Sequence, residues 1–135
     1  MGMECYLLRL EGSNSMDHME SDLIRLRRME PDSSYKTGSR GERYFVFRDG
    51  EHVIELELHP VSGGRVTKVS MRFALCHPDS VDRVFVEIAA GLMTRRNLSA
   101  TICEDLPSGT QRDYSRHEID AFRVWCLWSI ENARQ

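Results

Sequence analysis

Two short turns join three alternating segments between Tyr44 and Leu75, and they constrain the fold more than any other feature. The first turn, Asp49-Gly50, is a residue pair typical of two-residue β-hairpin loops. The second contains Gly63-Gly64. Three strands joined by such short turns can pair only as an antiparallel meander. We therefore expect a three-stranded sheet at the centre of the fold.

The two turns also predict which side chains share a face of this sheet. The first places Phe47 opposite His52, and the second places Glu55 opposite Arg72. Both pairings give the same alternation of inward and outward residues. The side expected to face the core carries Phe45, Phe47, Ile54, Leu56, Leu58, Val69, Met71, Phe73 and Leu75.

The opposite side of the meander mixes charged and apolar residues. It carries Tyr44, Val46, Arg48, Val53, Glu55, Glu57, His59, Val66, Lys68, Ser70, Arg72 and Ala74. A solvated face is usually more polar than this, and a buried face is usually less so. It is either a solvated face, whose charge pairs contribute at most about 1 kcal/mol each, or a binding surface. The candidate binding residues on this face are Tyr44, Glu55, Glu57, His59 and Arg72.

Before the meander, the sequence predicts one strand, one helix and one loop. Glu4–Leu10 is mostly apolar, as in a strand covered on both faces, and the polar stretch Glu11–Ser15 should end it. A helix is expected from Met16 to about Met29, with one apolar stripe. The polar stretch Asp32–Glu42 is expected to be a loop.

After the meander, a helix, a strand and a second helix are expected. The first helix opens near Pro78 and ends at the basic, turn-forming stretch Arg95–Asn97. Leu98–Glu104 alternates like a strand, and a polar loop with room for a short extended piece follows it. Ser115 and Glu118 have the spacing of a capping box and should begin the last helix.

The predicted element order is therefore β-α-β-β-β-α-β-α. It indicates one α+β domain over residues 1–135, with an antiparallel-rich sheet and helices mainly on one face. This plan is ferredoxin-like, with an extra strand and a C-terminal helix.

The last helix is apolar on nearly all sides. Ile119, Phe122, Cys126 and Ile130 form one stripe, and Val124, Trp125, Leu127 and Trp128 surround it. Such a helix must be covered on nearly all sides. Either it packs between the sheet and another helix, or Trp125 and Trp128 anchor a subunit interface. We expect a homodimer or another protein partner.

Composition and charge exclude several classes of protein. The net charge of −3 argues against a general nucleic-acid binder, although Arg25, Arg27, Arg28, Lys36 and Arg40 could form a local basic group. No apolar run reaches the length that spans a bilayer, and the N-terminus lacks the pattern of a secretory signal. We therefore expect a cytoplasmic protein with reduced cysteines and no membrane partner.

The residue types of a catalytic or metal site do not occur at the required spacings. No two histidines or cysteines have zinc-ligand spacing, and His52 and His59 fall on opposite faces of one strand. Cys76 beside His77 is the best candidate thiol, although a core cysteine is more common at such a position. We predict no catalytic residue, metal or cofactor. Arg43 falls inward, so either the strand starts at Tyr44 or Arg43 reaches a carboxylate.

The favoured function is a small, soluble, non-catalytic interaction or binding module. Its size, charge and plan are like those of small chaperones and immunity proteins, which is an analogy of fold only. The alternative is a small enzyme or ligand-binding domain that uses a cleft near the sheet face. In that case Asp32–Glu42 would act as a lid.

Overall fold

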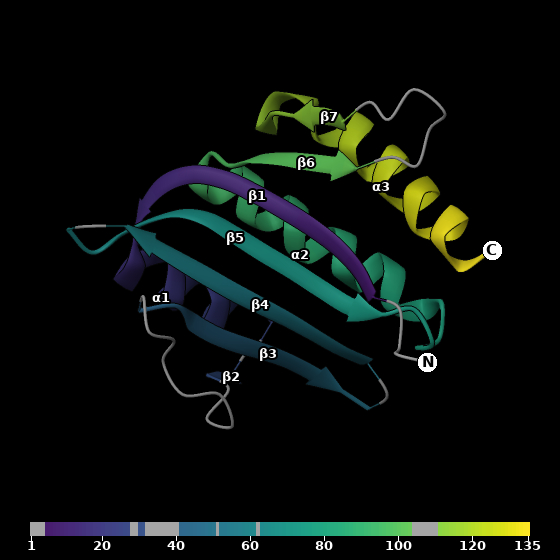
Figure 1. Cartoon of the computed structure of the whole chain (residues 1–135), viewed down its shortest axis with the longest axis horizontal. Helices are drawn as coiled ribbons and strands as arrows, with labels where there is room; N and C mark the ends of the chain where they lie inside the picture. The colour runs from purple at the N-terminus through teal and green to yellow at the C-terminus, as the bar shows by residue number, and fades with distance from the viewer. Residues whose placement is uncertain (1–4, 28–29, 32–40, 51, 62, 104–110) are drawn as a thin grey trace.

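The computed structural model describes residues 5–27, 30–31, 41–50, 52–61, 63–103 and 111–135. Within these residues the chain forms one seven-stranded antiparallel sheet, in the order β2-β3-β4-β5-β1-β6-β7 (Figure 1). The strands are β1 (Cys5–Ser15), β2 (Glu30–Pro31), β3 (Arg43–Asp49), β4 (His52–Val61), β5 (Arg65–Ala74), β6 (Ser99–Cys103) and β7 (Gln111–Tyr114). The helices are α1 (Met16–Arg27), α2 (Ser80–Arg96) and α3 (Ile119–Arg134), the last preceded by a 3₁₀ turn at Arg116–Glu118. The α+β class is confirmed.

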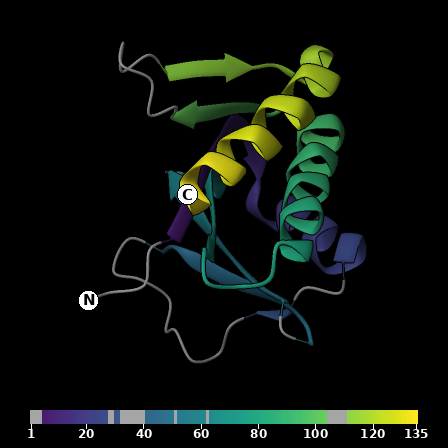
Figure 2. The same ribbon diagram turned by 90° about the vertical axis from the view of Figure 1, so that its right-hand side faces the viewer.

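The helices lie mainly on one face of the sheet, as expected. Figure 1 shows α1 and α2 behind the sheet, and the view turned by 90° in Figure 2 places them together on one side of it. In the described part of the chain, no helix crosses the other face. Two short strands differ from the predicted order. The two-residue β2 was not predicted, and β7 is the short extended piece for which the second polar loop had room.

The first hairpin keeps its predicted faces, but its register was predicted wrongly by two residues. Asp49 pairs with His52 and Phe47 pairs with Ile54, so the turn starts at Gly50 rather than at Asp49. Gly50 has a φ of +60°, which a glycine adopts without steric cost. A shift of two residues leaves every side chain on its own face.

The second hairpin has the predicted register over its central part, where Glu55 pairs with Arg72 and Glu57 pairs with Ser70. Near the turn, the register shifts between His59 and Pro60. This shift leaves one extra residue in β5 and reverses the alternation there. Val66 is consequently 1% exposed and belongs to the core, so its predicted place on the outer face was wrong.

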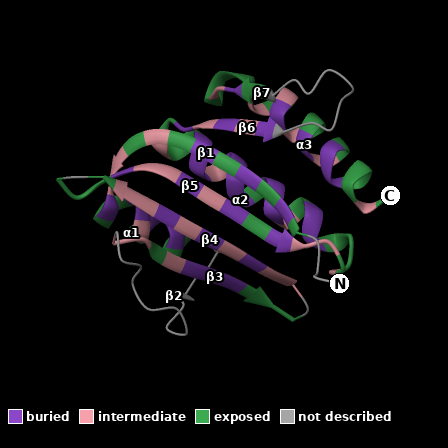
Figure 3. Ribbon diagram, in the orientation of Figure 1, coloured by how far each residue is buried: buried purple, intermediate pink, exposed green. Residues whose placement is uncertain are grey.

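The core lies between the sheet and the helices. Every meander residue predicted for it is buried, except Leu75, which is partly buried against it (Figure 3). Three aromatic rings connect the sheet to α2. The ring centroid of Phe73 lies 5.9 Å from that of Tyr6 in β1 and 4.9 Å from that of Phe85 in α2. Aromatic contacts of this kind pack the sheet against α2.

The first strand is longer and more exposed than predicted. It continues to Ser15 through the polar stretch that was expected to end it, and it bulges between Glu11 and Asn14. Gly12 has a φ of +157°, and a Cβ atom there would lie 3.0 Å from the Asn97 carbonyl oxygen, so the bulge favours a glycine. Burial alternates along β1 and Leu7 is 63% exposed, because β1 has helices on one face only.

The last helix, α3, begins after the predicted capping box and buries only one of its sides. The predicted capping box is present, since the Ser115 amide donates to Glu118 Oε1 at 3.1 Å. The stripe that includes Phe122 and Cys126 is buried. The Tyr6 hydroxyl of β1 donates to Ser129 Oγ at 3.1 Å, so α3 lies on the helix side of the sheet. Its other side is not covered within the described residues.

Candidate functional site

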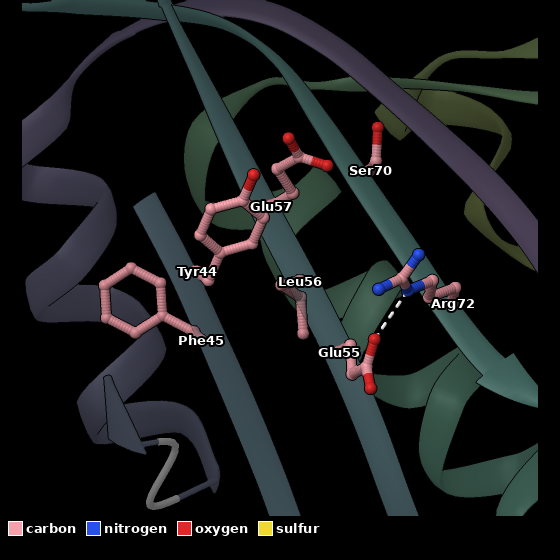
Figure 4. Close-up of a pocket in the computed structure, with 7 residues that line it drawn as sticks. All are labelled: Tyr44, Phe45, Glu55, Leu56, Glu57, Ser70 and Arg72. Atoms are coloured by element: carbon pink, nitrogen blue, oxygen red, sulfur yellow. Dashed lines mark hydrogen bonds and ion pairs between the residues drawn. The ribbon is translucent and has the colours of Figure 1, made fainter. Parts of the chain in front are cut away.

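The five binding residues predicted for the meander lie together on the helix-free face of the sheet. Tyr44 comes from β3, Glu55 and Glu57 come from β4, and Arg72 comes from β5 (Figure 4). His59 also comes from β4. The alternation of three adjacent strands brings them together, because every second residue of each strand points to the same side. Of the predicted binding residues, these five form the site, and Trp125 and Trp128 lie elsewhere.

Cross-strand pairing arranges the side chains of this face in rows. In one row Tyr44 lies opposite Glu57 and Glu57 lies opposite Ser70. In the next row Glu55 lies opposite Arg72. Side chains directly opposite each other on antiparallel strands are close enough to interact. The register therefore places a phenol, two carboxylates, a hydroxyl and a guanidinium within one small area.

The Glu55–Arg72 pair forms one wall of the site. Arg72 Nε donates to Glu55 Oε2 at 2.5 Å, and the two side chains are 47% and 36% exposed. At this exposure water screens the charges, so the pair contributes at most about 1 kcal/mol to stability. Its main effect is to hold the Arg72 guanidinium over the sheet and to neutralise the charge of the Glu55 carboxylate.

Tyr44 and Glu57 form the opposite wall. The pKa of the Tyr44 phenol is raised, first by desolvation and then by the charge of the Glu57 carboxylate and a hydrogen bond to it. Figure 4 shows the Tyr44 hydroxyl on the same side of the sheet as the Glu57 carboxylate. The Tyr44 phenol is protonated at neutral pH and donates its hydrogen bond to the Glu57 carboxylate.

His59 lies between Glu57 and Ser70 and contacts both. Its Nε2 atom lies 3.0 Å from Ser70 Oγ and 3.7 Å from Glu57 Oε2. In a Ser–His–acid triad the acid binds one ring nitrogen and the serine the other. Here both contacts use the same nitrogen, so the group does not have the geometry that activates a serine.

A small pocket opens between the two walls. It is lined by Tyr44, Phe45, Glu55, Leu56, Glu57, Ser70 and Arg72 (Figure 4). Its cavity volume is about 20 Å³, which is room for about one water. Sites for metabolites are usually roughly 300–1,000 Å³. The pocket is therefore suited to one small group, not to a whole metabolite.

The helix-free face extends well beyond the meander, into a part that was not predicted from the sequence. Arg9 of β1 lies opposite both Ser70 and Thr101 of β6, and Thr101 lies opposite Asp113 of β7. Thr101 Oγ1 donates to Asp113 Oδ1 at 2.7 Å. The charged Arg9 within an apolar run was the available sign that one face of β1 is open.

The charges of this face are balanced. Among the described residues of the seven strands, the positively charged members are Arg9, Arg48, Arg65, Lys68 and Arg72, and the negatively charged members are Glu11, Glu55, Glu57 and Asp113. Positive and negative side chains alternate rather than segregate. Such a surface is not predominantly basic, as a surface that binds a polyanion usually is.

Arg43 and His52 point to the helix side instead. Arg43 Nη1 donates to Glu20 Oε1 of α1 at 2.6 Å, so the alternative in which Arg43 reaches a carboxylate is correct. His52 Nε2 lies 2.7 Å from Ser80 Oγ at the start of α2. His52 and His59 therefore lie on opposite faces of β4, as predicted.

Trp125 and Trp128 form a second, separate surface on α3. The two rings meet edge to face with their centroids 5.5 Å apart, and the side chains are 37% and 40% exposed. The Arg112 guanidinium of β7 lies 6.0 Å from the Trp125 ring centroid. Val124 beside them is 65% exposed. Because α3 lies on the helix side, this aromatic surface is not continuous with the five-residue site.

The other candidate groups add no chemistry to the site. Cys126 is buried, and desolvation raises the pKa of its thiol to about 12. Cys76 is exposed and precedes α2 by several residues. Of the basic group, Arg28, Lys36 and Arg40 lie outside the described residues. No cluster of three or more histidine, cysteine, aspartate or glutamate side chains that could hold a metal ion occurs in the described ranges.

Comparison with known proteins identifies no relative. No family model, curated protein or solved structure matches the chain. Among the three helices that the structure describes, none is long and apolar enough to cross a membrane.

Proposed function

We propose that this protein is a non-catalytic interaction module that binds a protein partner on the helix-free face of its sheet and works in the cytoplasm. One observation supports this most strongly. A broad sheet face carries exposed apolar groups such as Leu7 beside rows of alternating charges, and within the described residues no helix packs on it. Exposed apolar groups within a polar surface are typical of protein–protein contacts.

The balanced charges favour a protein as the partner. A nucleic acid would require a predominantly basic surface, because its affinity comes largely from phosphate neutralisation. A protein surface can instead match alternating charges one by one, and such matching contributes specificity and association rate. By analogy of size, charge and plan, the expected role is that of a small chaperone or immunity protein.

The geometry of the site favours binding over catalysis. The pocket has room for about one water, and His59 uses one nitrogen for both of its contacts. The buried thiol of Cys126, with its raised pKa, is not a nucleophile at neutral pH. The alternative function, a small enzyme or ligand-binding domain, would need a wider cleft at this face than the pocket provides.

A second surface supports self-association. Trp125 and Trp128 are exposed, contact each other and lie on a regular helix. Tryptophan is enriched at the centres of protein interfaces, and two-fold dimers are the commonest oligomers. We therefore place the proposed homodimer contact on α3, which leaves the helix-free sheet faces of both subunits available to a partner.

Capture from a lysate of the source cells, compared across two matched variants, tests the sheet-face proposal. Leu7→Asp places a charge on the helix-free face, and Ile24→Asp makes the same change at an exposed apolar position of α1. The proposal predicts one protein that wild type and Ile24→Asp capture equally and that Leu7→Asp captures at least about tenfold less. Equal capture by all three proteins would contradict it.

A further inference from the structure

A wide, open cleft lies between α2 and α3, on the helix side of the sheet and away from the five-residue site. The two helices pack side by side there (Figure 2). The cleft is lined by residues at the start of α2 and in the last two turns of α3, and its volume is about 680 Å³. Sites for small molecules usually have roughly 300–1,000 Å³. This cleft is therefore large enough for a whole metabolite.

Two ion pairs join the helices at the cleft. Arg123 of α3 pairs with Glu87 of α2 at 3.0 Å, and Arg134 of α3 pairs with Asp82 of α2 at 2.6 Å. Because the later residue of α3 pairs with the earlier residue of α2, the two helices run in opposite directions. The Arg134–Asp82 pair is part of the lining, and its two charges neutralise each other.

Three other charged side chains of the lining have no partner. Within the described part of the chain, Asp79, Arg83 and Glu131 form no ion pair and no side-chain hydrogen bond. Asp79 holds the N-cap position of α2, where a carboxylate usually accepts an amide hydrogen bond, but its side chain accepts none. All three side chains are exposed. Their charged groups are therefore open to a ligand.

The unpaired charges define the chemistry of a matching ligand. They are one guanidinium, from Arg83, and two carboxylates, from Asp79 and Glu131. A guanidinium binds a carboxylate through two parallel hydrogen bonds, and a carboxylate accepts hydrogen bonds from an ammonium group. Leu127 adds a partly buried apolar side chain to the lining, against which a methylene chain can pack. The matching molecule has one carboxylate and two cationic groups on an aliphatic chain.

From these observations we propose that the cleft between α2 and α3 binds an α-amino acid with a basic side chain. Arg83 holds the carboxylate of the ligand, and Asp79 and Glu131 accept hydrogen bonds from its two cationic groups. The aliphatic chain of the ligand lies on Leu127. The site goes beyond the proposed partner surface, because it is on the other side of the sheet and takes a small molecule.

A titration followed by two-dimensional NMR at neutral pH and constant ionic strength tests the inference. The probe is L-lysine, and each of three analogues lacks one of its charged groups. Norleucine lacks the side-chain ammonium, 6-aminohexanoate lacks the α-ammonium, and 1,5-diaminopentane lacks the carboxylate. Lysine should bind with a dissociation constant on the order of 10 mM and shift the amides of Arg83 and Glu131 saturably. Each analogue should bind at least about threefold more weakly.

Variants of exposed side chains show whether the cleft itself makes these contacts. Arg83→Gln should weaken lysine binding at least about threefold and should abolish the preference for lysine over 1,5-diaminopentane, because the carboxylate then has no partner. Glu131→Gln should weaken lysine binding by a similar factor. Arg95→Gln removes an exposed arginine of α2 outside the cleft and should leave the constant within about twofold. The spectra also report whether each variant keeps the fold.

Three results would each overturn the inference. The first is equal binding of lysine and norleucine, and the second is the absence of saturable shifts at Arg83 and Glu131. The third is a preference for lysine over 1,5-diaminopentane that Arg83→Gln leaves unchanged. None of these results depends on capture of the protein partner, so the proposed function stands or falls separately.

Discussion

Arg134 in the last turn of α3 binds Asp82 in the first turn of α2, with Arg134 Nη2 2.6 Å from Asp82 Oδ1. The same guanidinium donates to the backbone carbonyls of Leu75 at 2.5 Å and His77 at 2.8 Å. Asp82 is only 5% exposed. One arginine thus joins the end of the chain to the connection between β5 and α2.

Arg134→Met should therefore destabilise the protein by about 3 kcal/mol, because it leaves a buried carboxylate without its cation. Arg123→Met is the matched control. Arg123 pairs with Glu87 at 3.0 Å, but both side chains are at least 40% exposed, so its loss should cost less than about 1 kcal/mol. Urea unfolding measures both values. Equal losses would show that the Arg134 contacts do not stabilise the fold.

A second buried ion pair predicts how stability depends on acid. Asp22 of α1 accepts a hydrogen bond from Arg96 of α2, which lowers the pKa of the Asp22 carboxyl against the opposing effect of burial. A carboxyl whose pKa is lowered in the folded state stabilises the protein at pH values above its unfolded-state pKa of about 4. That stabilisation is lost as the pH falls through the folded-state pKa.

The expected result is a stability difference between wild type and Asp22→Asn that is full above about pH 5 and shrinks below about pH 4. Urea unfolding over a pH series measures this difference. A difference that stayed constant down to pH 3 would mean that Asp22 is not a titrating partner of Arg96.

The cysteines should differ in reactivity. Cys126 is buried with the pKa of its thiol raised to about 12, whereas Cys5 and Cys76 are exposed. In the folded protein at pH 8, iodoacetamide should modify Cys5 and Cys76 at least about tenfold faster than Cys126, because the thiolate is the reactive form. Peptide mapping by mass spectrometry follows each site. Comparable rates at Cys126 and Cys76 would contradict the buried position.

The proposed homodimer gives a clear expectation for mass. Wild type should show about twice the 15.6 kDa of one chain by light scattering at micromolar concentration. Trp128→Glu, which charges the exposed side of α3, should show the mass of one chain. Ile24→Asp serves as the control for an exposed apolar position and should remain dimeric. A monomeric wild type would remove the dimer from the proposed function.

Local patterns were sufficient to predict the meander and the site within it. Alternation between close turns placed Phe47 and Ile54 in the core, and it placed Glu55 opposite Arg72 on the outer face. The two-residue error at the first hairpin did not move a side chain to the wrong face, because side chains alternate with a period of two.

The features that were missed depend on contacts between distant segments. Leu7 is exposed because β1 lies between β5 and β6 with helices on one side only, and Arg9, two residues along, was the one local sign of this. Val66 lies in the core, not on the predicted outer face, because of a β-bulge whose position depends on the pairing of β5 with β4.

Hydroxyl-radical footprinting of the captured complex addresses the helix-free face itself. If the partner binds there, oxidation of Tyr44 and Leu7 should fall at least about threefold on addition of the partner, since both side chains become covered. Oxidation of Ile24 on α1 should stay unchanged. The opposite pattern, with Ile24 protected and Tyr44 and Leu7 oxidised as in the free protein, would show that the partner binds the helix side and that the sheet face is not the binding surface.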